Sequence, residues 1–247
     1  MTEITVDTDE LEKIRKTLSR EPERNISVLG FLRMNPGSVK NAFYEGVSIA
    51  VVVENAAGER YAFLHGDDEV GVGRLVERLY PEVKTFSSVE DRMMPAITQG
   101  RVIKSVFPTR RYVLPDDVEI APPAVPMRRL DGSFAEYVKK HYEYDYLKVE
   151  YARDRLEKGI SAGVFDGDSL VAWGMTHDDG ALGTLYVLPE VRGRGYGEAV
   201  TRALIIEKRK AGEPVFLNVL HGNVRSSNLV EKMGFVFDRN ASWVELA

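Results

Sequence analysis

The sequence predicts an α+β protein with two mixed, mostly antiparallel sheets, each flanked by helices. Amphipathic helical segments alternate with short apolar, strand-like runs along the 247 residues. The order strand, Gly-x-Gly, helix, strand, helix occurs in both halves, and Gly71 and Gly195 are separated by about half of the chain. This spacing favours an internal repeat. The alternative is a chance match between short glycine motifs.

Proline marks the boundary between the halves. Four of the eleven prolines fall within residues 115–126, where they exclude a helix and favour extended backbone. We therefore expect a first domain at 1–114, a proline-rich linker at 115–126 and a second domain at 127–247. A long surface loop within one domain is the alternative interpretation.

The second half has the clearer pattern of elements. Asp131 is a typical N-cap, and Gly212 and Gly234 are typical residues at helix ends. Turn signals at Asp166–Asp168 and Asp178–Gly180 separate three strands. The expected helices are 132–141, 147–158, about 199–209 and 224–233, and the expected strands are 160–165, 170–176, 181–188, 215–220 and 235–237, resuming near Trp243.

The first half predicts a similar order from weaker signals. The expected helices are 11–19, 26–34, 74–80 and 89–98, and the expected strands are 47–53, 60–64 and 83–86. Gly71-Val-Gly73 stands before the third of these helices, as a glycine-rich loop does in the second half.

Composition excludes several functions. The 38 acidic and 33 basic residues give a net charge of −5, which offers no basic stripe to nucleic acid. The chain has no cysteine, and its four histidines are not spaced as metal ligands, so we expect no metal. The apolar stretch 47–53 is too short to cross a bilayer, and the polar start of the chain does not resemble a signal peptide. We expect a soluble cytoplasmic protein with neither membrane nor nucleic acid as a partner.

The segment Val187–Gly197 carries the most specific motif. Its residues Arg192, Gly193, Arg194, Gly195, Tyr196 and Gly197 follow a strand and lead into a helix. Glycines let backbone N–H groups face outward, while the helix N-terminus and two arginines add positive charge, and both features favour a pyrophosphate. The loop is not a P-loop, because it lacks the lysine of that motif. It does not match the dinucleotide fingerprint either, because Glu198 or Thr201 stands where the third glycine is required. A glycine-rich turn without a ligand is the alternative.

The pattern R-x-x-G-x-G, present as Arg192, Gly195 and Gly197, resembles the acyl-CoA pyrophosphate loop of the GNAT superfamily of N-acyltransferases. Asn223–Phe235 resembles the second signature of that superfamily, and the resemblance covers 127–247. It implies acetyl-CoA or another acyl-CoA as co-substrate. The cofactor-binding residues that it implies are Leu185, Val187, Arg192, Gly193, Arg194, Gly195, Tyr196, Gly197, Asn223 and Ser226.

The two-domain layout, the run Leu188–Arg192 and the terminal Ser242-Trp243 are most similar to the glycine N-acyltransferase branch. The resemblance thus implies two GNAT-like sheets, of which the N-terminal copy is degenerate. In that half, Asp68 takes the place of Arg192, and adjacent carboxylates would repel a phosphate. We therefore expect the first half to bind no CoA and to shape or cover the acceptor cleft.

The resemblance also implies direct attack of an amine on the thioester, with a backbone N–H near Leu185 or Val187 stabilising the oxyanion. The usual acid and base of the family are absent. The positions that match the base are Ala181 and Gly183, and the position that matches the acid is Val230. None of these three side chains can take or give a proton.

Asp178 is the candidate replacement for the base. A two-residue Asp179-Gly180 turn would place Asp178 opposite Ala181 on one sheet face, about 5 Å away at Cβ. The alternative is that Asp178 is a polar turn residue. His177 and His221 are weaker candidates.

The resemblance places the acceptor cleft near His141–Tyr146. Tyrosines interleaved with Glu143 and Asp145 would hold a cationic amine by charge and cation–π contact. The alternative is tyrosines packed on the core beside exposed acids. Tyr151 and Trp173 are expected in the core.

The sequence therefore predicts an acyl-CoA-dependent N-acyltransferase that moves an acyl group, most simply acetyl, to the amine of a small molecule or amino acid. The alternative is a non-catalytic acyl-CoA-binding sensor or regulatory module, because the usual acid and base are missing. Protein lysine acetylation would use the same residues, and a first half packed over the cleft argues against it. Oligomeric state stays open.

Overall fold

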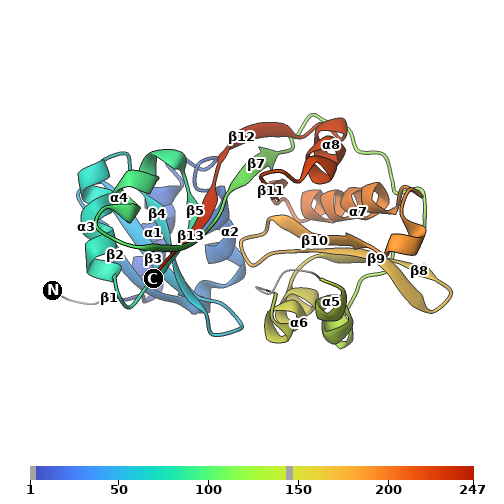
Figure 1. Cartoon of the computed structure of the whole chain (residues 1–247), viewed down its shortest axis with the longest axis horizontal. Coiled ribbons are helices and arrows are strands. Elements are labelled where there is room, and N and C mark those ends of the chain that lie inside the picture. Colours follow the sequence, from blue (N-terminus) through green and yellow to red (C-terminus); the bar gives the residue numbers. More distant parts are fainter. Residues whose placement is uncertain (1–3, 143–146) are drawn as a thin grey trace. The chain divides into compact units, whose positions relative to one another are not determined.

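The structure, a computed structural model, describes residues 4–142 and 147–247. The chain forms two compact units, and neither is a single stretch of sequence (Figure 1). The first unit comprises Met1–Arg111, Val219–Gly222 and Asp238–Ala247, and the second comprises Tyr112–Asn218 and Asn223–Phe237. Among the described residues, no helix is long and apolar enough to cross a membrane.

After a short strand, the first half follows the order helix, helix, three strands, helix, strand, helix. Its elements are β1 (Ile4–Thr5), α1 (Thr8–Leu18), α2 (Ile26–Met34), β2 (Val39–Glu45), β3 (Ser48–Glu54), β4 (Arg60–His65), α3 (Glu69–Leu79), β5 (Thr85–Val89) and α4 (Met94–Thr98), followed by β6 (Ile103–Phe107) and β7 (Thr109–Val113).

The second half repeats this order. Its elements are α5 (Ala135–His141), α6 (Val149–Lys158), β8 (Ser161–Asp166), β9 (Ser169–Thr176), β10 (Leu182–Val187), α7 (Tyr196–Lys210), β11 (Phe216–Leu220) and α8 (Val224–Lys232), followed by β12 (Val236–Asn240) and β13 (Ser242–Leu246). The shared order confirms the predicted α+β architecture of two similar halves.

The strands form two mixed sheets, as predicted. One has seven strands in the order β1-β2-β3-β4-β5-β13-β6, and the other has six in the order β12-β7-β11-β10-β9-β8. The pairs β4–β5 and β10–β11 are parallel, and a helix connects the two strands of each pair. The meanders β2-β3-β4 and β8-β9-β10 are antiparallel.

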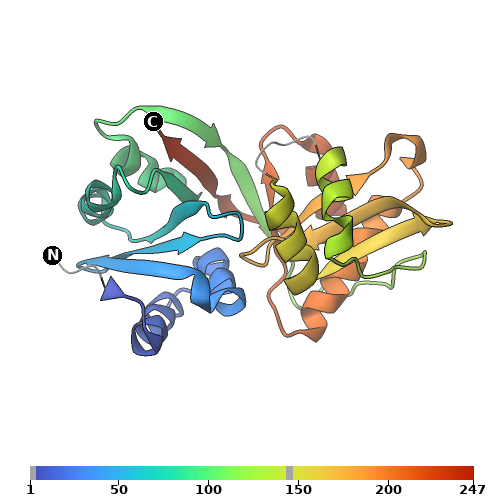
Figure 2. The same ribbon diagram turned by 90° about the horizontal axis from the view of Figure 1, so that it is seen from below.

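Strand β3 shows why helices cover both faces of the first sheet. Ile49, Val51 and Val53 pack in one core cluster with α1 and α2. Ala50 and Val52, which point the opposite way, pack in a second cluster with α3 and α4. A strand buried on both faces is apolar along its length, as this one is, instead of alternating. Figure 2 shows these helices from below.

The second sheet is covered in the same way. Helix α7 packs on one face, where a β-carbon at Gly174 would lie 3.0 Å from side-chain atoms of Val200 and Leu204. Helices α5 and α6 lie on the other face (Figure 1), and there Tyr137 of α5 meets Trp173 of β9 edge to face. Trp173 and Tyr151 are both buried, as expected of core residues.

The two halves exchange a strand. Strand β13, from the end of the chain, pairs antiparallel with β5 and β6 of the first sheet, and β7 lies between β12 and β11 in the second sheet. The last ten residues, which we expected in the domain 127–247, therefore belong to the first unit. Pairing between segments so distant in sequence leaves no local signal.

The proline-rich segment 115–126 lies within the second unit and does not bridge the two units. Arg209 of α7 donates to the backbone oxygens of Val118 and Pro115 at 2.6 and 2.8 Å, and Arg202 donates to that of Ala121 at 3.3 Å. The extended segment thus runs along α7. It is a long loop within one unit, which was the alternative interpretation of the sequence, and not a linker between the units.

Most predicted helices and strands are present, with shifted ends, and one difference bears on the site. Helix α3 begins at Glu69, so Gly71 and Gly73 lie inside the helix and form no glycine loop. Strands β1, β2, β6 and β7 were not predicted.

Leu246→Ala is expected to lower the free energy of unfolding of the first unit by about 2–5 kcal/mol, because it leaves a cavity. Leu246 is fully buried although it ends the last strand. Trp173 and Trp243 are the two tryptophans of the chain. Urea unfolding in a Trp173→Phe background, followed by Trp243 fluorescence, therefore reports on this unit.

Val102→Ala is the matched control, because Val102 is 73% exposed. Its unfolding free energy should change by no more than about 0.5 kcal/mol. Equal unfolding free energies for Leu246→Ala and the wild type would contradict the place of β13 in the first sheet.

Candidate functional site

Strands β10 and β11 separate almost as soon as they pair. Their single register pair is Leu182 opposite Leu217. On its other side, β10 pairs with β9 at Leu182 and Gly183 and again at Tyr186 and Val187, with an irregularity between them. Thr184, inside this bulge, has a φ of +45°, which is rare for a residue with a side chain. The bulge turns β10 away from β11.

The loop after β10 ends in an uncapped helix N-terminus. Gly193 and Gly195 have φ values of +81° and +79°, a conformation that favours glycine. Gly195 is the N-cap of α7 and makes no side-chain hydrogen bond. Within the described residues, the backbone N–H groups of 193–198 have no hydrogen-bond partner. Unpaired N–H groups at a helix N-terminus are a favourable position for an anion.

Arg192 and Arg194 are exposed beside these N–H groups. Arg192 donates from Nε to the backbone oxygen of Val187 at 3.0 Å, and its guanidinium carbon lies 5.8 Å from the centre of the Tyr186 ring. These contacts hold one positive charge at the end of β10, at the start of the loop.

Two oxygens beside the separated strands have no partner in the described part of the chain. They are Oγ1 of Thr184, in the bulge, and Oδ1 of Asn218, the residue of β11 that follows the last register pair. An unpaired buried polar atom costs about 1–3 kcal/mol. An extended ligand with amide N–H groups would satisfy both acceptors, so the chemistry of these two residues fits such a ligand.

Asn223 and Ser226 lie at the start of α8. The side chain of Asn223 caps the helix by accepting from the backbone N–H of Ser226 at 3.1 Å. Leu185 and Val187 are half-buried on β10. The predicted cofactor residues thus come from β10, from the loop before α7 and from the start of α8, all within the second unit.

The turn after β9 differs from the prediction. The N–H of His177 donates to the oxygen of Ala181 at 2.8 Å, so His177, and not Asp178, stands opposite Ala181. The turn has three residues instead of two, and Gly180 takes a φ of +82°. Asp178 is buried, and its Oδ1 accepts from the Tyr151 hydroxyl at 3.2 Å.

The remaining predicted residues add little to the site. Ala181 and Val230 are buried, as small and apolar side chains. His221 falls in the segment Val219–Gly222, which belongs to the first unit. Of the expected acceptor stretch, residues 143–146 lie outside the described residues. The described residues contain no cluster of three or more His, Asp or Glu that could hold a metal ion.

The corresponding helix N-terminus in the first unit is already occupied by a carboxylate. Residues 66–68 separate β4 from α3, whereas 188–195 separate β10 from α7. Asp68 is the N-cap of α3 and accepts from the N–H groups of Val70 and Gly71 at 3.1 and 2.9 Å. In the structure Asp68 therefore corresponds to Gly195, and not to Arg192 as expected.

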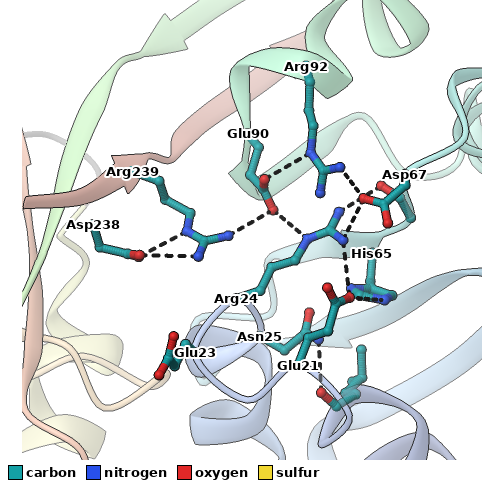
Figure 3. A network of polar contacts seen from close by, with 12 residues as sticks. Glu21, Glu23, Arg24, Asn25, His65, Asp67, Glu90, Arg92, Asp238 and Arg239 are labelled. Carbon is teal, nitrogen blue, oxygen red and sulfur yellow. Dashed lines mark hydrogen bonds and ion pairs between the residues drawn. The ribbon is translucent and has the colours of Figure 1, made fainter.

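Arg24 closes the space between the ends of β4 and β5 (Figure 3). It donates to Glu90 at 2.8 Å, to Asp67 at 2.8 Å and to the oxygen of Gly66 at 2.7 Å. Burial raises the pKa of Glu90, but the hydrogen bonds and charges of Arg24 and Arg92 outweigh it and hold this pKa below its usual value. A charged network thus fills the place that is open between β10 and β11.

Sequence reasoning missed two features of these sites. The Arg24 network joins segments that are distant in sequence, so no local pattern signals it. The ring of His177 lies over Gly183, where a β-carbon would be 2.0 Å from Nε2. The sequence signal for this contact was a histidine that lies diagonally across the hairpin from a glycine. The two-residue turn that we predicted places His177 at a different register, so the signal was missed.

Comparisons with known proteins agree with this geometry. Residues 159–244 match the family model of FR47-like proteins. A Drosophila protein of solved structure is similar over 99% of this chain and 98% of its own, at a TM-score of 0.85 and 16% identity. A tandem GNAT protein from the clavulanic acid biosynthesis pathway is similar over 99% and 97%, at a TM-score of 0.61 and 13% identity.

A GCN5-related N-acetyltransferase from Kribbella flavida is similar over 91% of this chain and 93% of its own, at a TM-score of 0.60 and 14% identity. No curated protein sequence matches the chain. Identities this low establish the fold alone. The two units therefore form a tandem GNAT fold.

Asp68→Ala is expected to lower the unfolding free energy of the first unit by about 0.5–2 kcal/mol, because it removes the cap of α3. Asp68→Asn is the matched control and should retain most of the stability, since asparagine caps nearly as well. Urea unfolding followed through Trp243 measures both variants. Equal losses would contradict the capping role.

Proposed function

We propose that the protein is an acyl-CoA-dependent N-acyltransferase whose co-substrate binds the second unit. The observation that carries this proposal is the loop before α7, to which we assign the binding of a pyrophosphate. Its backbone N–H groups at 193–198 have no partner among the described residues and lie beside Arg192, at the end of a strand that has separated from β11. A pyrophosphate needs the first feature, and an extended amide chain needs the second. The FR47-like match and the tandem GNAT fold support a GNAT superfamily protein.

The acyl-CoA arm would lie along β10 from Gly183 to Val187, held by backbone hydrogen bonds as another strand would be. A backbone N–H near Leu185 or Val187 would stabilise negative charge on the thioester oxygen. Thr184 and Asn218 offer acceptors to amide N–H groups of the arm. The reaction that this arrangement supports is direct attack by the amine of a small molecule or amino acid.

The first unit, in this proposal, is a degenerate copy that binds no acyl-CoA. Asp68 supplies a carboxylate to the helix N-terminus where a phosphate would bind, and Arg24 fills the space between the strand ends. A negative ligand would have to displace the Asp68 carboxylate and compete with Glu90 and Asp67 for the positive charge of Arg24.

A non-catalytic acyl-CoA sensor is the second candidate. The observation in its favour is that Ala181, Gly183 and Val230 occupy the positions where related enzymes carry their base and acid. Both candidates bind acyl-CoA through the same loop, so turnover distinguishes them.

Saturating acetyl-CoA should raise the melting temperature of the wild type, and Arg192→Glu should abolish the rise. Binding at 100 times Kd adds about 2.7 kcal/mol, or several degrees for a chain of this size. Lys210→Glu is the matched control, because it makes the same charge change at the opposite end of α7. An absence of stabilisation by acetyl-CoA and by longer acyl-CoAs would contradict the proposal.

Turnover is then measured as thiol released from acetyl-CoA in the presence of a panel of small amines and amino acids. The chain has no cysteine, so released CoA is the only thiol in the reaction. Release that depends on an amine supports the enzyme, and binding without release for every amine supports the sensor.

A further inference from the structure

The ring of His177 occupies the place of a missing side chain on β10. Gly183 has no side chain, and a β-carbon built there would lie 2.0 Å from Nε2 of His177 and 2.3 Å from Cδ2. His177 is opposite Ala181, and Met175 is opposite Gly183, so these side chains share one face of the hairpin. The imidazole thus projects over the strand where it bulges away from β11.

Tyr151 of α6 holds the other ring nitrogen. Its hydroxyl lies 3.1 Å from Nδ1 of His177, donates to Oδ1 of Asp178 at 3.2 Å and accepts from the N–H of Asp178 at 3.2 Å. A phenol has one proton, which goes to the carboxylate, and its oxygen can accept two hydrogen bonds. With the phenol proton directed to Asp178, Nδ1 of His177 is the nitrogen that carries a proton and donates it to the phenol oxygen.

This arrangement leaves Nε2 of His177 with a lone pair. Within the described residues, Nε2 has no hydrogen-bond partner. Burial raises the pKa of Tyr151 well above its usual range, and the Asp178 carboxylate raises it further. The phenol therefore stays protonated over the working pH range and keeps the imidazole in this one tautomer.

Lys208 and Asp179 hold the turn that carries these groups. Lys208 of α7 is fully buried and donates to the backbone oxygen of Gly180 and, at 3.1 Å, to Glu213. Asp179 accepts from the N–H of Ala181 at 2.9 Å. The charged and titratable groups around the pair are Asp178 and Asp179 of the turn, and Tyr151 and Arg155 of α6.

We propose that His177 is the general base of the acyl transfer, and that Tyr151 and Asp178 are positioning residues that orient its ring. The inference rests on the proposed function. It assigns to the residue that follows β9 the proton transfer that neither Ala181 nor Gly183 can perform.

The amine nitrogen forms a bond to the thioester carbonyl carbon, the carbon–sulfur bond breaks, and its electron pair leaves with the CoA sulfur. Nε2 of His177 takes one proton from the nitrogen and releases it to that sulfur or to water. The products are an amide and CoA, and His177 returns to its starting tautomer.

His177→Ala is expected to lower kcat by about 100-fold or more while acetyl-CoA stabilises the protein as in the wild type. Imidazole added to this variant should restore part of the rate, because the ring leaves a space over Gly183. A residue with a purely structural role would show no such rescue. His221→Ala is the matched control and should keep the wild-type rate.

Tyr151→Phe keeps the imidazole but removes the group that fixes its tautomer, so kcat should fall by about 10-fold or more. The ¹⁵N spectra of the four histidines provide a readout without substrate. His177, assigned by its loss in His177→Ala, should be protonated at Nδ1 in the wild type and shift toward the Nε2-protonated form in Tyr151→Phe.

The outcomes separate this inference from the proposed function. Amine-dependent turnover in the wild type together with a wild-type rate in His177→Ala would overturn the inference alone. A ring protonated at Nε2 in the wild type would also overturn it. Failure of every acyl-CoA to stabilise the wild type would overturn the proposed function, and the inference with it.

Discussion

The candidate site depends on the separation of β10 from β11 after one register pair. Parallel strands normally satisfy each other's backbone groups, and leaving them unpaired is costly. Here Thr184 lies in a bulge at a positive φ, and in the described part of the chain its hydroxyl oxygen and the side-chain oxygen of Asn218 have no partner. Strained backbone and unpaired polar atoms persist where the surrounding structure enforces them, often at functional sites. In this chain, a hairpin on one side and α7 on the other provide that surrounding structure.

The same order of elements produces two different outcomes in the two units. In the first, β4 and β5 pair at Ala62 and Phe63, the loop to α3 is short, and Asp68 caps the helix. In the second, a longer loop with two left-handed glycines leaves the helix N-terminus open. The difference lies in the pairing of the two parallel strands, in loop length and in whether a side chain of the protein occupies the helix N-terminus.

Local patterns predicted what depends on neighbours in sequence. Gly193 and Gly195 are glycines that the backbone requires, and α2 has the predicted ends. Contacts between distant segments could not be predicted from local patterns. Strand β13 joins the first sheet, and β7 joins the second. Strand β2 reads Val39-Lys-Asn-Ala-Phe-Tyr-Glu45, without clear alternation. The error at Asp178 came from the length of the turn. Asp-Gly occurs in three-residue hairpin loops as well as in two-residue ones, and the extra residue places His177, instead of Asp178, opposite Ala181.

Hydrogen–deuterium exchange with and without acetyl-CoA tests the central claim most directly, because the co-substrate should cover backbone amides that no other described residue binds. The account predicts slower exchange at residues 183–187 and 193–198 when acetyl-CoA is present, and unchanged exchange at 66–73 of the first unit. Unchanged exchange at 193–198, or protection confined to 66–73, would contradict it.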